Sequence, residues 1–176
     1  DQIYADHVAG PMLDAIEQVT ALLGLPDETF EQAPIADTTA LYQHPHNIYG
    51  RDKLLPHYVN DESWWRRCLP TTTTPIFSSR ECENHLMSFS EFFAMYLLVW
   101  SPTLWSFVDR DRFVRNGYCN AGVAVSLKWQ QTWQHEVPII DDFVAGLDNV
   151  RRLMAHIPTY MIFDDHDITD DFQLNR

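Results

Sequence analysis

Apolar residues recur at every third or fourth position between Pro11 and Gly24, and they predict the first helix of the chain. Proline suits the first turn of a helix, and glycine is favoured just after the last turn. Farther along, Ser88 and Glu91 have the spacing of a capping box, in which each side chain bonds the other residue's backbone N–H. The segment that follows, EFFAMYLLVW at 91–100, is apolar almost all round and therefore predicts a central, buried helix.

The second half of the chain predicts two more helices, which Pro138 separates. One is expected over residues 121–136, and the other is a long amphipathic helix over residues 139–157. A proline interrupts a helix because it lacks a backbone N–H and its ring crowds the preceding turn. Shorter helices are expected at 38–43, 52–58 and 61–69, and residues 71–75 are expected to form a linker or an extended segment.

Two short segments near the ends of the chain have the character of strands. TYMIF at 159–163 is rich in β-branched and aromatic residues and is followed by polar ones, so it predicts a buried strand. DQIYAD at 1–6 has the pattern of a chain leaving another strand. A crossover between parallel strands needs only about a dozen residues or somewhat more, so most of the chain is predicted to be an insertion. The predicted fold class is mainly α, with a helical insertion flanked by two strand ends of an α/β domain.

Composition narrows the choice of function. The net charge of −13 argues against a nucleic-acid-binding surface, which needs clustered lysine and arginine. The longest apolar run, 92–100, is far shorter than the ~20 residues of a membrane helix. No signal peptide is visible, but the chain starts at Asp1 without an initiator methionine. We therefore expect a piece of a longer protein whose true N-terminus is missing, and no compartment is predicted.

The acidic motif DDHD, Asp164 to Asp167, follows the predicted strand at 159–163. Functional groups of parallel α/β sheets lie just past the carboxyl ends of strands. Crowded carboxylates beside an imidazole suit a cation, and Mn, Fe, Ca, Mg and Zn are all compatible with these ligands. His166 can bind a metal or donate a proton to an anionic substrate. The alternative is a capped helix start, with Thr169 or Asp170 as the N-cap.

In the motif DQIYAD, Asp1 and Tyr4 stand three residues apart where a strand turns into a loop. From this spacing a carboxylate and a phenolate can reach one metal, and tyrosinate is a rare ligand that favours ferric iron. Other candidates are weaker. His44 and His46 are interpreted as loop residues, and Trp129 and Trp133 are interpreted as core rather than as a binding groove.

Together the two motifs resemble the PhoD-like alkaline phosphatases, which belong to the calcineurin-like metallophosphoesterases. DQIYAD is similar to that family's GDQIYxD block, and IFDDHDITDDF is similar to its WDDHE block, with Phe163 for tryptophan and Asp167 for glutamate. The resemblance covers about twenty residues at the two ends. It implies that the flanking strands belong to an α/β metallophosphoesterase sandwich and that the substrate is a phosphate ester.

The resemblance also implies a role for each matching residue. Asp1 is the expected bridge between two metals, Tyr4 matches the iron-binding tyrosine of PhoD members, and Asp165 is the next expected metal ligand. His166 matches the histidine that contacts the phosphate and assists the leaving group. Asp164 is expected to support and orient its neighbours. Asp167 occupies the place of a supporting glutamate, and its shorter side chain leaves its role open.

The implied mechanism is two-metal hydrolysis, in which a metal-bound hydroxide attacks phosphorus and His166 stabilises the departing oxygen. The family's other ligand blocks are absent from this chain, so we expect little or no phosphatase activity from the chain alone. The predicted organisation is a catalytic block at 1–7, a cap-like helical insertion at 8–157, and a strand with the DDHD block at 158–176. The alternatives are a helical binding module without a catalytic role, and a structural domain in which DDHD only caps a helix.

Overall fold

The computed structural model describes residues 2–31, 33–58, 74–75, 82–162 and 164–169. These residues are mainly helical, as predicted. The α-helices are α1 (Gly10–Leu23), α2 (Thr38–Tyr42), α3 (Phe89–Trp100), α4 (Arg110–Asn116) and α5 (Leu127–His156). The 3₁₀ helices are η1 (Arg51–Lys53), η3 (Leu104–Phe107) and η4 (Asp165–Asp167). Strand β1 (His57–Tyr58) pairs antiparallel with β2 (Thr74–Pro75), and β3 (Cys119–Asn120) pairs antiparallel with β4 (Val123–Ala124).

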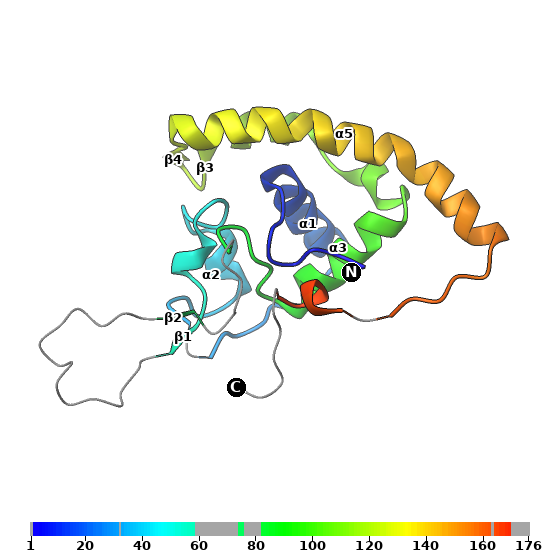
Figure 1. Cartoon of the computed structure of the whole chain (residues 1–176). Helices are drawn as coiled ribbons and strands as arrows, with labels where there is room; N and C mark the ends of the chain where they lie inside the picture. Colours follow the sequence, from blue (N-terminus) through cyan, green and yellow to red (C-terminus); the bar gives the residue numbers. More distant parts are fainter. Residues whose placement is uncertain (1, 32, 59–73, 76–81, 163, 170–176) are drawn as a thin grey trace, which may run out of the picture.

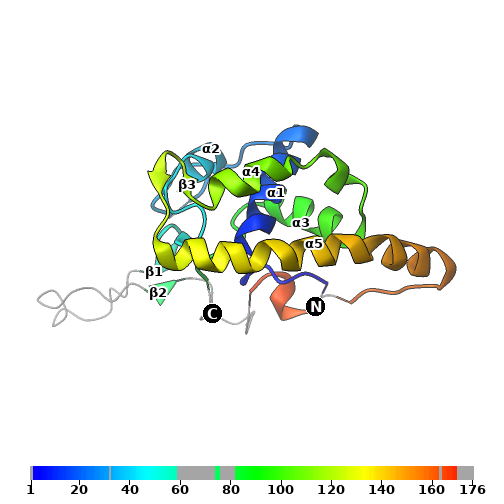
Figure 2. The ribbon, with the colours of Figure 1, turned by 90° about the horizontal axis from the view of Figure 1, so that it is seen from above.

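Helix α1 lies at the centre of the molecule, and α3 and α5 pack against it. Figure 2 shows α5 running along one side and extending past the other helices at its C-terminal end. The main core is formed by apolar side chains from the N-terminal segment and from these three helices, and it includes Ile3, Ala5, Ile16, Leu98 and Leu147. No helix among the described residues is long and apolar enough to cross a membrane.

The two ends of α1 are stabilised in different ways. Residues next to the helix mark its C-terminal end, whereas a distant residue stabilises its N-terminal end. Gly24 has φ of 62°, and the N–H groups after the helix bond back to the carbonyls of Ala21 and Thr20. At the other end, Ala9 offers no capping side chain. Instead Glu136 of α5 accepts the Gly10 N–H at 2.8 Å. A remote carboxylate therefore satisfies a donor that the local sequence leaves open.

Helix α3 begins with the predicted capping box between Ser88 and Glu91, which confirms that prediction. The prediction of a central buried helix holds for one face and fails for the other, because Phe89 is 72% exposed and Phe93 is 42% exposed. The opposite face carries Ala94 and Leu98, which are fully buried against the core. Helix α3 thus lies at the edge of the core and leaves an aromatic stripe at the surface of the described structure.

The two helices predicted on either side of Pro138 are one continuous helix, α5, of 30 residues. Pro138 removes only the hydrogen bond to the carbonyl four residues earlier. Trp133 and Ile140, which flank the proline, are both buried, so core packing holds the helix together across it. The start is also different from the prediction, since the β3–β4 hairpin occupies 119–124 and α5 begins only after its N-cap, Ser126.

The predicted short helices and the predicted strand agree with the structure only in part. The helix at 38–43 is confirmed by α2, but 52–58 forms the end of η1 and then β1. The helix at 61–69 and residues 71–73 lie outside the described residues. The strand predicted at 159–163 is not formed, since residues 159–162 are irregular and 163 lies outside the described residues. A single strand has no stability without a hydrogen-bonded neighbour, and the described residues supply none there.

Candidate functional site

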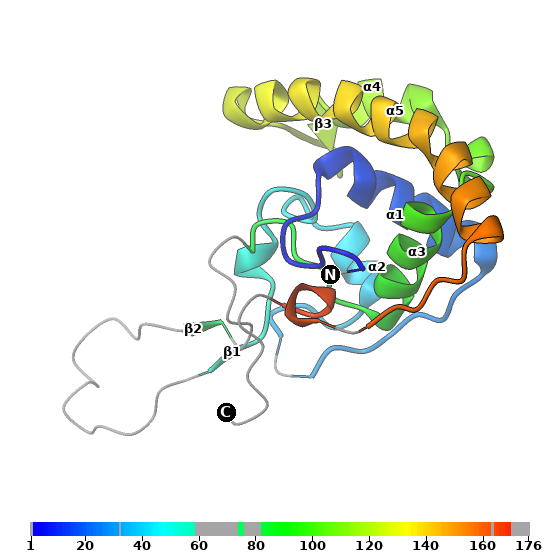
Figure 3. The same cartoon turned by 45° about the vertical axis from the view of Figure 1, so that its right-hand side comes forward.

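Three segments that are distant in sequence meet beside α1 and α3. The N–H of Ala5 donates to the carbonyl of His166 at 3.0 Å, and the carbonyl of Ala5 accepts the N–H of Leu86 at 2.8 Å. Figure 3 shows the N-terminal segment next to the short helix η4. The two motifs that were singled out at opposite ends of the chain are therefore adjacent in the folded molecule.

Asp167 holds the two motifs together. One carboxylate oxygen accepts the N–H groups of Gln2 and Ile3 at 2.8 and 2.9 Å, and the other accepts the N–H of Asp164 at 2.9 Å. The side chain is buried, and hydrogen bonds to a charged acceptor are stronger than neutral ones. Asp167 thus fixes the N-terminal segment against η4, with two contacts to that segment and one to the start of η4.

Tyr4 and His166 lie in direct contact. Their rings are stacked, with centroids 4.6 Å apart and an interplanar angle of 29°. Ile3 and Ala5, on either side of Tyr4, are buried in the core, whereas Tyr4 itself is 50% exposed. The alternation of inward and outward side chains along the N-terminal segment therefore anchors the segment and presents the tyrosine at the surface.

Asp6 is a functional candidate that sequence reasoning missed. Its carboxylate oxygens lie 3.0 and 3.2 Å from Nδ1 of His166, across 160 residues of sequence. The side chain is only 5% exposed, so the pair is largely shielded from water on the Asp6 side. A carboxylate that accepts from one ring nitrogen fixes the orientation of the ring and directs Nε2 away from itself. The second acid of DQIYAD was the available signal, but the chain pattern does not show which partner it finds.

His85 lies behind Asp6 and is fully buried. Burial lowers the pKa of His85, because desolvation disfavours the charged imidazolium. Its Nδ1 lies 2.6 Å from the carbonyl of Leu86, which fits a neutral ring with the proton on Nδ1. Burial therefore favours the neutral form of this ring beside Asp6.

Asp164 and Asp165 have different environments. Asp164 is the N-cap of η4 and accepts the N–H of Asp165 at 3.0 Å, and together with Asp167 it forms a capping box. A capped helix start was the alternative interpretation of the motif, although the cap is Asp164 and not Thr169. Asp165 is half-buried in the first turn of η4. Asp1 lies outside the described residues, so its predicted position beside Asp165 stays a prediction.

Among the described residues, no group of three or more histidine, cysteine, aspartate or glutamate side chains could hold a metal ion. The predicted ligands that are described, Tyr4 and Asp165, supply only oxygen donors. Two donors are fewer than the protein ligands that zinc or calcium sites normally use. The described residues therefore do not form a metal site by themselves.

Comparison of the chain with protein families, with curated protein sequences and with solved structures returned no match.

Proposed function

We propose that the chain is the central part of a PhoD-like, metal-dependent phosphatase that hydrolyses phosphomono- or phosphodiesters. The observation that supports this most directly is the stacking of Tyr4 on His166, with ring centroids 4.6 Å apart. These two residues come from the two motifs that resemble the family. A helical domain with unrelated acidic ends gives no reason for these particular side chains to meet.

In this proposal His166 acts on the leaving group. Its Nδ1 faces the carboxylate of Asp6, so Nε2 is the nitrogen left for the substrate. When water attacks phosphorus and the phosphorus–oxygen ester bond breaks, a proton from Nε2 passes to the departing oxygen. The carboxylate of Asp6 stabilises the protonated ring before this transfer. The products are the free alcohol and the phosphate or phosphate monoester.

The metal ligands of the proposal are Asp1, Tyr4 and Asp165, completed by residues outside this chain. The metal ions would neutralise charge on the phosphoryl oxygens and activate a water molecule. Oxygen donors of this kind are compatible with Fe, Ca, Mn, Mg or Zn. Because the set is incomplete here, we expect the isolated chain to have little or no activity.

The finer fold assignment belongs to the same proposal. We propose that the strand predicted at 159–163 forms as part of an α/β sandwich in the longer parent protein, and that the helical part between the two motifs forms a cap over the site. Tyr160 is 95% exposed and Ile162 is 83% exposed, and apolar side chains of this kind are normally covered. Neighbouring strands from the parent would cover them.

The alternative function is a helical module that binds a partner. It is favoured by the exposed aromatic residues on α3, of which Phe89 is the most accessible. The same alternative predicts that the two ends of the chain are separated, whereas residues 2–6 contact η4. The contact between the ends is the reason that we place the enzyme first.

The test is turnover of a chromogenic phosphomonoester and a phosphodiester by the full-length parent. We expect His166→Ala to lower kcat by about 100- to 10,000-fold, the usual contribution of a general acid, and Asp1→Asn to lower activity as well. Asp6→Asn, which removes the carboxylate facing Nδ1, is expected to lower kcat less than His166→Ala. His156→Ala, at an exposed position at the end of α5, is the matched control. Wild-type turnover in both His166→Ala and Asp1→Asn would contradict the proposal.

A further inference from the structure

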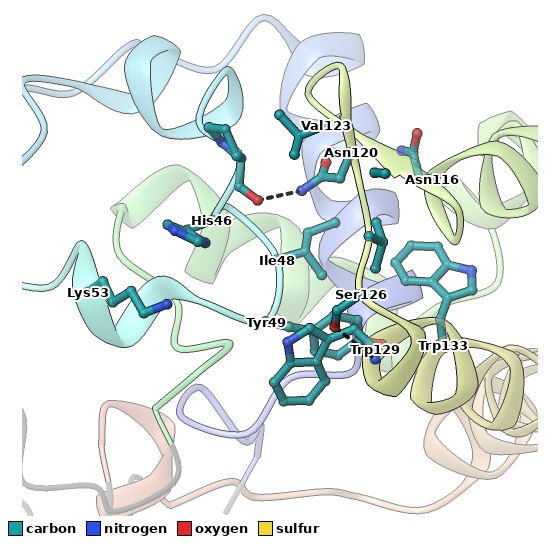
Figure 4. Close-up of a pocket in the computed structure, with 13 residues that line it drawn as sticks. His46, Ile48, Tyr49, Lys53, Asn116, Asn120, Val123, Ser126, Trp129 and Trp133 are labelled. Atoms are coloured by element: carbon teal, nitrogen blue, oxygen red, sulfur yellow. Dashed lines mark hydrogen bonds between the residues drawn. The ribbon is translucent and has the colours of Figure 1, made fainter.

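A pocket of about 240 Å³ lies on the helical body, apart from the Tyr4–His166 contact. Figure 4 shows that its walls come from the loop that contains His46, from η1 with Lys53, from the β3–β4 hairpin, and from the first turns of α5. None of the residues proposed for phosphatase chemistry lines it. The pocket therefore lies in the helical part that the proposed function treats as a cap, away from the residues proposed for the chemistry.

One wall of the pocket holds an aromatic residue in a strained backbone conformation. Tyr49 has φ of 56°, which is unusual for a bulky side chain. Three contacts hold it there: its N–H donates to Asn84, its hydroxyl donates to Glu136 at 2.5 Å, and its ring stacks on Trp129 with centroids 4.6 Å apart. Strain that the surrounding structure maintains is concentrated at ligand-binding sites in proteins. This wall is therefore formed before any ligand arrives.

Two glycines bring further rings close to the backbone around the pocket. A Cβ atom at Gly50 would lie 2.8 Å from Cβ of His46, and one at Gly117 would lie 2.7 Å from Cδ1 of Trp133. Only glycine allows these close approaches. His46 and Trp133, which both line the pocket, are thus packed directly against the main chain, and their rings have little freedom to move.

The charge of the pocket is opposite to that of the chain. Lys53 and His46 line it, while no aspartate or glutamate is among its lining residues in the described structure. The whole chain carries −13, and Lys53 is one of only two lysines. Within the described residues Lys53 makes no ion pair. An ammonium group and an imidazole beside a cavity without carboxylates favour an anionic group.

The other lining residues suit a small apolar group of a ligand. Ile48, Val123 and Trp129 provide apolar surface, and the side-chain amides of Asn116 and Asn120 add polar groups at one side. The volume is below the range of about 300–1,000 Å³ that drug-sized ligands occupy. We propose that this pocket binds a small organic anion, namely a single ring that carries one carboxylate or phosphate group, with the anionic group at Lys53 and His46 and the ring against Ile48.

Calorimetric titration of the 176-residue chain with benzoate, phenyl phosphate and benzyl alcohol tests this proposal. Benzoate and phenyl phosphate are expected to bind, and benzyl alcohol, which has the same ring without the charge, is expected to bind about tenfold more weakly or worse, as befits a lost charge-assisted hydrogen bond. The two anions separate carboxylate from phosphate recognition. Absence of heat with both anions, or equal affinity for benzyl alcohol, would overturn the proposal.

The chain provides its own matched controls. Lys53→Met is expected to weaken benzoate binding about tenfold or more, whereas Arg151→Met, which removes an exposed cation of α5 that does not line the pocket, is expected to leave it unchanged. Val123→Trp, at a half-exposed hairpin position, fills the pocket and is expected to abolish binding without disturbing the core. His166→Ala is expected to retain full binding, so this proposal and the phosphatase proposal can fail separately. Equal losses of benzoate affinity in Lys53→Met and Arg151→Met, or full binding by Val123→Trp, would show that the ligand binds elsewhere.

Discussion

Replacement of Arg51 by methionine is expected to lower the free energy of unfolding by about 3–5 kcal/mol, the range for breaking a buried ion pair. Arg51 and Glu91 are 1% and 0% exposed, and their side chains meet at 2.9 and 3.1 Å. The guanidinium also donates to the carbonyls of Asn47 and His85, so it ties the loop before η1 to the segment before α3. Without it, the Glu91 carboxylate remains buried with only the N–H groups of Met87 and Ser88. Urea denaturation provides the measurement.

Two further variants test the physical reason for this loss. Arg151→Met removes an exposed arginine whose ion pair to Asp148 spans 3.4 Å, and a change of less than about 0.5 kcal/mol is expected. The double variant Arg51→Met with Glu91→Gln removes the unpaired charge and keeps an acceptor for Met87 and Ser88. The double variant is expected to regain a substantial part of the free energy of unfolding that Arg51→Met loses. If the double variant is as unstable as the single one, an unpaired buried charge is not the cause.

Asp167→Asn is expected to loosen the N-terminal segment from η4. The asparagine keeps one oxygen but places an NH₂ group opposite a backbone N–H, so at least one of the contacts to Gln2, Ile3 or Asp164 becomes a clash of donors. A hydrogen bond to a charged acceptor contributes roughly 1.5–3 kcal/mol, so the exchange protection of these amides should fall about tenfold or more. Hydrogen exchange followed by NMR measures each amide separately.

The matched control for this prediction is Asp148→Asn, at a side chain that is 73% exposed on α5. It is expected to leave the exchange of all three amides unchanged. Wild-type protection of all three amides, those of Gln2, Ile3 and Asp164, in Asp167→Asn would show that other contacts hold the N-terminal segment in place, and that Asp167 is not the residue that joins the two motifs.

The sequence predicted those elements whose signals are local. Pro11 and Gly24 bound α1, and Ser88 with Glu91 starts α3, because caps act within one turn of the helix. Contacts between distant residues could not be predicted in the same way. Glu28, for example, accepts the N–H groups of Phe89 and Ser90 from 61 and 62 residues away.

Tertiary packing also explains the wrong predictions. Pro138 is a strong local signal for a helix end, but buried neighbours on both sides carry α5 through it. At the candidate site, the two motifs pointed to Tyr4 and His166, and the rings of these residues are in contact in the structure. Asp6 was missed because its role depends on the fold bringing it to Nδ1 of His166, and no spacing within DQIYAD indicates that partner.

The two ends of the chain meet at Tyr4 and His166, and nuclear Overhauser spectroscopy of the 176-residue chain measures this contact. Tyr49 and Trp129, which have the same centroid distance of 4.6 Å, serve as the internal reference. Cross-peaks are expected between the ring protons of Tyr4 and those of His166, with an intensity comparable to that of the reference pair. Assigned resonances that show the reference cross-peaks but none between Tyr4 and His166 would contradict it.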